Sequence, residues 1–150
     1  MSTPYSEVFK AFLGKINDFD KTLVSDEVLE ADMVTLLNAA IPYFRLPRKD
    51  LSLRDDYLKE FEEDLNNDEI QILSSLMKRE WYKRFISDTE VTIQKFGEND
   101  FEFKSQANHL KALVAGQTES LDKEVKKMIS NYSRTPDNKI FDYSRLVGKK

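Results

Sequence analysis

The stretch from Asn66 to Ile86 carries large apolar side chains at steps of three and four residues. This spacing places them on one face of a helix, so it predicts an α-helix here. Asn66 or Asn67 is suited to cap its start, and Asp68 and Glu69 follow where the helix dipole favours negative charge. We therefore expect this helix to lie at the centre of the core. Its apolar positions are Ile70, Leu73, Leu76, Met77, Trp81 and Phe85.

Three further helices are expected on the same grounds. The first covers Tyr5–Ile16, the second Ser25–Phe44 and the last Ser105–Tyr132. Pro42 is expected to break or kink the second helix near its end, because proline lacks an N–H and clashes with the preceding turn. Together the four helices predict an all-α fold, a small helical bundle with a long C-terminal helix. The core is expected to contain Leu36, Leu73, Met77, Trp81, Phe85, Leu110 and Leu121.

The segments between these helices show less regular patterns. Arg45–Leu65 is expected to be a connector, with an irregular or short helical piece at Asp55–Asp64. Acidic side chains cluster in Asp55–Asp64, which indicates a solvated face or, alternatively, a metal or partner site. Thr89–Phe96 fits either a continuation of the central helix or a short strand. Phe101–Phe103 alternates in polarity but is too short to found a sheet.

The last helix carries an apolar stripe of nearly heptad spacing. Its residues from Leu110 to Tyr132 follow the pattern of helices that pack along their length, although Gly116 interrupts it. At roughly 1.5 Å per residue, the helix is about 40 Å long. Since a small domain needs less, we expect one end of this helix to contact another subunit.

Residues 134–150 are expected to form an extended C-terminal arm beyond a helical domain of residues 1–133. From Ser133 to Lys150 there are five basic and two acidic side chains, a charge of +3, which leaves −7 for the rest of a chain of net charge −4. The arm is also rich in apolar residues for a disordered tail. It is therefore predicted to order on a partner, and the alternative is a frayed terminus folded loosely on its own domain. The expected partner-binding residues are Arg134, Lys139, Ile140, Phe141, Tyr143, Arg145, Leu146 and Val147.

Length and composition limit the class of protein that this chain can be. The 150 residues suffice for one compact domain, and the absence of cysteine excludes disulfides and a thiol nucleophile. No apolar run approaches the roughly 20 residues that span a bilayer, and the first residues lack the pattern of a signal peptide. The lack of cysteine fits synthesis in a reducing cytoplasm, and no membrane contact is expected.

No motif for catalysis or cofactor binding is recognisable. The single histidine, His109, lies inside the last helix, and no Gly-rich loop or second histidine accompanies it. The pattern Asp64-x-Asn66-x-Asp68 resembles the start of a calcium loop, but Glu69 and Ser75 stand where that loop requires Gly and Glu. No catalytic residue, metal or cofactor is therefore expected, and an enzyme is unsupported.

Nucleic-acid binding is also disfavoured. The densest basic cluster is Lys78, Arg79, Lys83 and Arg84, but Trp81 and Phe85 between them indicate packing. The acidic charge of the body repels phosphates as well.

Two segments of the chain resemble a known family. They are Asp68–Trp81 (DEIQILSSLMKREW) and Phe101–Leu113 (FEFKSQANHLKAL), followed by a charged helix that ends in Asn131-Tyr132. In this order they resemble the head-to-tail connectors, also called adaptors or neck proteins, of tailed phages of Gram-positive bacteria. The likeness covers roughly residues 25–132, and its most specific piece is SQANHL at Ser105–Leu110.

The resemblance implies a structural virion protein in the phage neck, made in the host cytoplasm. Such proteins form an oligomeric ring, commonly of twelve copies, between the portal and the next neck or tail protein. The ring extends the DNA channel, through which DNA passes without specific binding, and a terminal arm often reaches the portal. The arm at residues 134–150 matches that role in position and composition. The alternative is a cytoplasmic helical interaction or regulatory module with no virion role.

Overall fold

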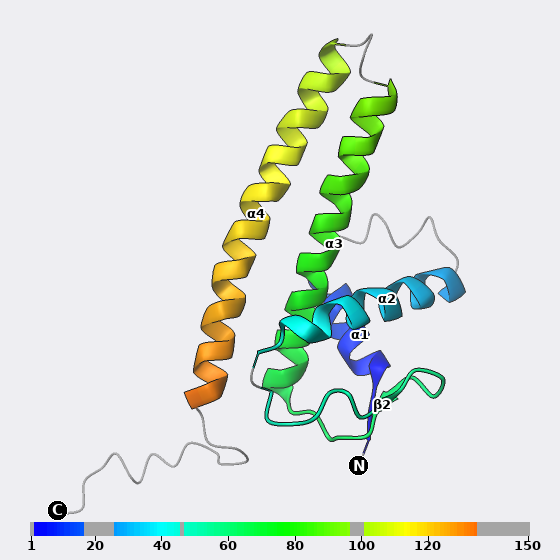
Figure 1. Ribbon diagram of the computed structural model, residues 1–150, viewed down its shortest axis with the longest axis vertical. Helices are drawn as coiled ribbons and strands as arrows, with labels where there is room; N and C mark the ends of the chain where they lie inside the picture. Colours follow the sequence, from blue (N-terminus) through cyan, green and yellow to red (C-terminus); the bar gives the residue numbers. More distant parts are fainter. Residues whose placement is uncertain (1, 17–25, 46, 97–100, 135–150) are drawn as a thin grey trace, which may run out of the picture.

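The computed structural model describes residues 2–16, 26–45, 47–96 and 101–134. In these ranges the chain is predominantly helical, which confirms the predicted fold class and the long C-terminal helix (Figure 1). The four α-helices of the described residues are α1 (Tyr5–Leu13), α2 (Asp26–Ala40), α3 (Asn67–Phe96) and α4 (Phe101–Arg134).

The first half of α3 is the centre of the body, where α1, α2 and α4 all pack against it. Leu73 and Met77 are fully buried there, as expected from their spacing. Trp81 packs half-buried against the edge of the core, and Phe85, one turn further, is also half-buried. Ile70, Ile72 and Leu76 of α3 are buried as well. The other helices and the connector contribute these buried apolar side chains: Tyr5, Val8, Phe9, Phe12, Met33, Leu36, Leu37, Ala40, Phe44, Leu51, Phe61, Leu65, Leu121, Val125 and Tyr132.

Proline ends α2 as expected. The α-helix stops at Ala40, and the chain continues as a 3₁₀ turn, η2 (Ile41–Tyr43), with Pro42 inside it. Phe44 then returns to the core, where its aromatic ring meets that of Tyr132 edge-on at 5.4 Å between centroids. The turn thereby brings the end of α2 against the end of α4.

A small antiparallel sheet replaces the irregular or short helical piece predicted for Asp55–Asp64. It consists of β1 (Thr3–Pro4), β2 (Arg54–Asp55) and β3 (Glu60–Phe61), in the order β1-β3-β2. Phe61 pairs with Thr3 on one side and with Arg54 on the other. Burial of the Phe61 side chain stabilises this arrangement, because its ring packs 4.9 Å from that of Tyr5. The prediction of an irregular or short helical piece at Asp55–Asp64 was therefore wrong, because β2 and β3 lie there.

The two long helices form a hairpin that extends beyond the body (Figure 1). Residues of Thr89–Phe96 continue α3 as helix, and α4 begins at Phe101, ahead of the predicted start at Ser105. No side chain is buried among residues 78–95 of α3 and 102–120 of α4. We call this part, residues 78–96 and 101–120, the distal hairpin. At about 1.5 Å per residue, residues 78–96 extend roughly 28 Å.

Leu110 corrects the predicted core. Its side chain is 47% exposed, because it lies in the distal hairpin, where α3 is the only described element that runs beside α4 (Figure 1). Leu110 and Leu121 belong to the same apolar face of α4, but this face becomes buried in the body only at Leu121. Helical spacing identifies the inner face of α4, but it does not show where along that face the body ends.

Candidate interaction surfaces

The start of α3 is fixed by a reciprocal capping arrangement. Asn66 Oδ1 accepts a 2.9 Å hydrogen bond from the Glu69 N–H, and Glu69 Oε2 accepts one of 2.8 Å from the Asn66 N–H. This is the capping-box geometry, with Asn66 in the position of the cap. Glu69 is only 1% exposed, so its carboxylate needs further partners inside the protein.

Two side chains from distant segments complete the shell around Glu69. The Tyr132 hydroxyl donates a 2.7 Å hydrogen bond to Glu69 Oε1, and Lys49 Nζ lies 3.1 Å from Oε2. Arg48 donates from its backbone N–H to the Tyr132 hydroxyl at 3.1 Å and from Nη2 to the Tyr132 carbonyl at 2.5 Å. We call Arg48, Lys49, Glu69 and Tyr132 the Tyr132 anchor. It holds the last turn of α4 against the first turn of α3.

The Tyr132 hydroxyl is held in its neutral, donating form. Burial raises its pKa to about 12, and the hydrogen bond to Glu69 adds to this, while the Arg48 N–H acts in the opposite direction. The Arg48 guanidinium also lies 4.5 Å from the centre of the Tyr132 ring. These contacts are those of a structural joint, because each buried polar group has a partner.

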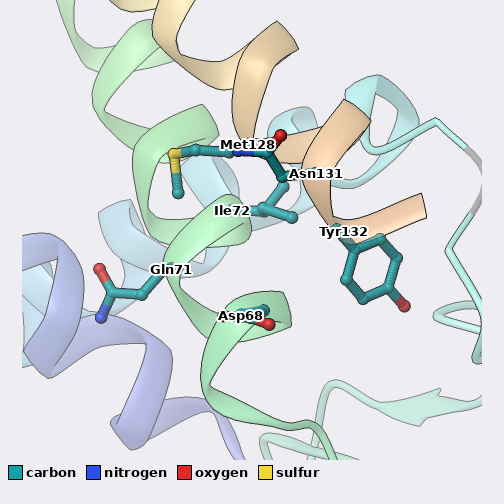
Figure 2. A pocket seen from close by; sticks show the side chains of 6 residues that line it. All are labelled: Asp68, Gln71, Ile72, Met128, Asn131 and Tyr132. Carbon is teal, nitrogen blue, oxygen red and sulfur yellow. The ribbon is translucent and has the colours of Figure 1, made fainter. Parts of the chain in front are cut away.

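A cavity of about 180 Å³ lies beside this joint (Figure 2). It is lined by the first turns of α3 and the last turns of α4, so it sits next to the residue where the described chain ends. Asp68 is the one carboxylate among its lining residues, so the cavity holds no carboxylate pair for acid–base chemistry. The lining residues are Asp68, Gln71, Ile72, Met128, Asn131 and Tyr132.

The predicted C-terminal arm begins at this point. Arg134 is the exposed last residue of α4. The other predicted arm residues lie outside the described residues: Lys139, Ile140, Phe141, Tyr143, Arg145, Leu146 and Val147.

A second hollow, which we call the basic groove, has a volume of about 460 Å³ and lies where η2, α3 and α4 meet. Its lining residues are Tyr43, Arg45, Leu76, Arg79, Asp122, Val125, Lys126 and Ile129. The Tyr43 side chain is 46% exposed, with the Arg79 guanidinium 4.6 Å and Lys83 Nζ 4.9 Å from its ring centre. Sequence reasoning missed this groove, because its residues are spread from position 43 to position 129.

The basic cluster noted in the sequence is distributed over several contacts. Arg79 bonds Asp122 of α4, and Arg84 bonds Asp32 of α2. Lys78 lies 5.5 Å from the Tyr82 ring centre. The cluster therefore ties α3 to its neighbours.

A third hollow, of about 370 Å³, lies on the distal hairpin. It is lined by Phe85, Asp88, Thr89, Thr92, Phe103, Gln106, Ala107 and Leu110. Exposed apolar side chains continue around it, with Val91 45%, Phe103 37% and Leu113 54% exposed. His109 is exposed on the same part of α4.

The turn between β2 and β3 presents the two most exposed large apolar side chains of the described residues. Tyr57 is 91% and Leu58 61% exposed. We call residues 54–64, which carry the predicted acidic cluster, the acidic turn. None of its six carboxylates is buried, so this segment lacks the buried carboxylate pair that acid–base chemistry would use.

Within the described residues, no three His, Cys, Asp or Glu side chains converge as metal ligands, and no helix combines the length and hydropathy needed to cross a membrane. Comparisons with protein-family models, curated proteins and solved structures found no match to this chain.

Proposed function

We propose that this protein is a structural head-to-tail connector of a tailed phage. In this proposal several copies, commonly twelve in the family that the sequence resembles, form an oligomeric ring between the portal and the next neck or tail protein. The ring extends the DNA channel. The residues assigned to this role form contacts between proteins and carry no catalytic step.

The observation that carries the proposal is the distal hairpin. Beyond Arg84 the described contacts of the distal hairpin lie mainly between its own two helices, and no side chain of residues 78–95 and 102–120 is buried. Apolar residues remain exposed on it, among them Val91, Leu110 and Leu113. Neighbouring copies packed side by side would cover these residues, in the way that exposed apolar patches generally mark protein contacts. Stability of the hairpin then depends on assembly.

The Tyr132 anchor supports the proposed role of the arm. Because the last turn of α4 is bonded to the body through Glu69 and Arg48, the chain beyond Arg134 leaves from a fixed point. An arm that starts from a fixed point loses less entropy when it binds a partner. The proposed partner of residues 135–150 is the portal.

Charge supports passage of DNA without retention. Residues 1–132 carry a net charge of −7, whereas residues 133–150 carry +3. DNA affinity depends strongly on the number of phosphates that basic side chains neutralise. An acidic body forms few such contacts, so DNA would slide through an oligomeric ring of these copies.

The proposal is tested by binding the full chain to the portal protein encoded near its own gene. We expect a stable complex, and we expect portal and capsid genes beside this one. A chain truncated after Arg134 should keep its circular dichroism, because the Tyr132 anchor is retained, but should lose portal binding. A truncated chain that binds the portal as tightly as the full chain would contradict the role of the arm. A full chain that does not bind the portal would contradict the proposed function.

A further inference from the structure

We infer that the acidic turn of one copy docks in the basic groove of the next copy and joins successive subunits head to tail. This inference rests on the proposed oligomeric ring, and it names the contact that closes it. The occupant is a second copy of this chain, with Tyr57 and Leu58 as the apolar tip that enters the groove.

The acidic turn is held in one conformation before it meets a partner. Asp55 Oδ1 accepts hydrogen bonds from the N–H groups of Tyr57 at 2.8 Å and Leu58 at 3.0 Å. Lys59 adopts a left-handed conformation with φ of 55°, and its carbonyl accepts a 2.8 Å bond from the Tyr5 N–H. A preorganised turn presents its side chains at a small entropic cost. Exposure of two large apolar residues on such a turn indicates a contact site.

Further bonds tie the acidic turn to the rest of the body. The Tyr5 hydroxyl donates a 2.6 Å hydrogen bond to Asp56 Oδ1, and Lys59 Nζ lies 2.8 Å from Glu30 Oε2. These bonds reach α1 and α2. The turn is therefore a rigid projection of the body.

The charges of the two surfaces are complementary. The acidic turn contains six carboxylates and two cations, a net charge of −4. Among the described residues, Glu62 and Glu63 have no cation within ion-pair distance, and Arg45 and Lys126 of the groove have no carboxylate. Glu62 and Glu63 on one surface are thus available to Arg45 and Lys126 on the other. Such complementarity fixes register and excludes like-charged partners.

The same reasoning separates this occupant from the C-terminal arm. Residues 133–150 carry +3, so the arm would meet charges of its own sign in a groove lined by Arg45, Arg79 and Lys126. Asp122, the one carboxylate of that lining, is already bonded to Arg79. The acidic turn is the better occupant, and Tyr57 adds an aromatic ring that the groove cations attract.

The positions of the two surfaces predict a contact that repeats from copy to copy. The acidic turn projects on the side of the body away from α4, whereas α4 forms one wall of the groove (Figure 1). Because two different surfaces meet, the contact is heterologous, and heterologous contacts form rings when the rotation closes.

Engineered disulfides test the contact directly, since the chain contains no cysteine. The full chain with Leu58→Cys and Ile129→Cys, oxidised at high protein concentration, should give a ladder of covalent oligomers on a non-reducing gel. The matched control combines Leu58→Cys with Ser120→Cys. Ser120 is exposed on the same helix but lies on nearly the opposite face from Asp122 of the groove, because two residues turn a helix by about 200°. We expect crosslinking about tenfold faster for the first pair, because docking raises the effective concentration of the two thiols.

A charge swap tests the electrostatic part. Glu62→Lys with Glu63→Lys should abolish the ladder, and adding Arg45→Glu with Lys126→Glu should restore it. Equal rates for the two cysteine pairs, the absence of any ladder, or a ladder that ends at the dimer would overturn the head-to-tail contact. Portal binding by the wild-type chain is measured separately. A chain that binds the portal without this crosslink would refute the inference and leave the proposed function standing.

Discussion

The hydroxyl of Tyr132 lies 2.7 Å from Oε1 of Glu69, so the last turn of α4 is bonded to the first turn of α3. Both residues are buried, and 63 positions separate them in the sequence. The bond closes the base of the α3–α4 hairpin at the point where the C-terminal arm begins. Stability of the body and presentation of the arm therefore depend on the same contact.

Replacing Tyr132 with phenylalanine should destabilise the body. The ring packing against Phe44 is retained, but Glu69 Oε1 and the Arg48 N–H lose their partner. A buried polar group left without a partner costs about 1–3 kcal/mol, and we expect a loss of that size in the free energy of unfolding measured with urea. Ser133 follows Tyr132 and is exposed, so Ser133→Ala serves as the control and should change the free energy of unfolding little. An equal effect of the two substitutions would argue against the anchor.

Glu69→Ala should have a larger effect than Asp68→Ala. The first substitution removes the capping box and leaves Lys49 and Tyr132 without their carboxylate, which predicts a loss of about 3 kcal/mol. Asp68 lies in the same turn but is exposed, and it acts mainly on the helix dipole, worth about 0.3–1 kcal/mol. Chemical denaturation of both variants under identical conditions measures the difference. If the two losses are the same, Glu69 is not the joint described above.

Stability should fall in alkaline solution between pH 10 and pH 12. The pKa of Tyr132 is raised from 10.0 to about 12 by burial and by its bond to Glu69, and burial and the bond to Asp56 also raise the pKa of Tyr5. Below pH 10 both tyrosines are protonated in the folded and unfolded chain. Above it the unfolded chain loses these protons first, so the folded state is progressively disfavoured.

The measurement is the free energy of unfolding of wild type and Tyr132→Phe at several pH values from 8 to 12. The variant should show a shallower decline above pH 10, since one of the two tyrosines no longer titrates. A decline of the same steepness in both proteins would contradict the assigned pKa.

Substitutions of two leucines of α4 should distinguish effects on folding from effects on assembly. Leu121 is 7% exposed and Leu110 is 47% exposed. Leu121→Ala should cost about 2–5 kcal/mol, as for other buried leucines, whereas Leu110→Ser should change monomer stability by less than about 0.5 kcal/mol. Sedimentation velocity should show that Leu110→Ser, combined with Leu113→Ser, weakens self-association. Unchanged association would mean that neighbouring copies do not cover the distal hairpin.

Helical elements with long amphipathic patterns were predictable from the sequence. The cap at Asn66 and the burial of Leu73 and Met77 follow from local spacing and local hydrogen-bond chemistry. The continuation of α3 through Val91 and Ile93 remained ambiguous, because β-branched residues favour strands locally. Packing of α4 along α3 accounts for the helix there.

The sheet and the surfaces could not be predicted in this way. Each strand has two residues, too few for an alternating pattern. Thr3 pairs with Phe61, which is far from it in the sequence. The sequence identifies Glu69 as a first-turn acid, but its burial depends on Tyr132 and Lys49, which only the fold brings to it. The basic groove likewise combines residues from three separate elements.

Electron microscopy of the full chain bound to its portal tests the central claim most directly. We predict a closed oligomeric ring on the portal, with distal hairpins of neighbouring copies side by side, and residues 135–150 in contact with the portal. A single copy at the portal, an assembly in which the distal hairpins stand apart in solvent, or no density for this protein at the neck would contradict the account.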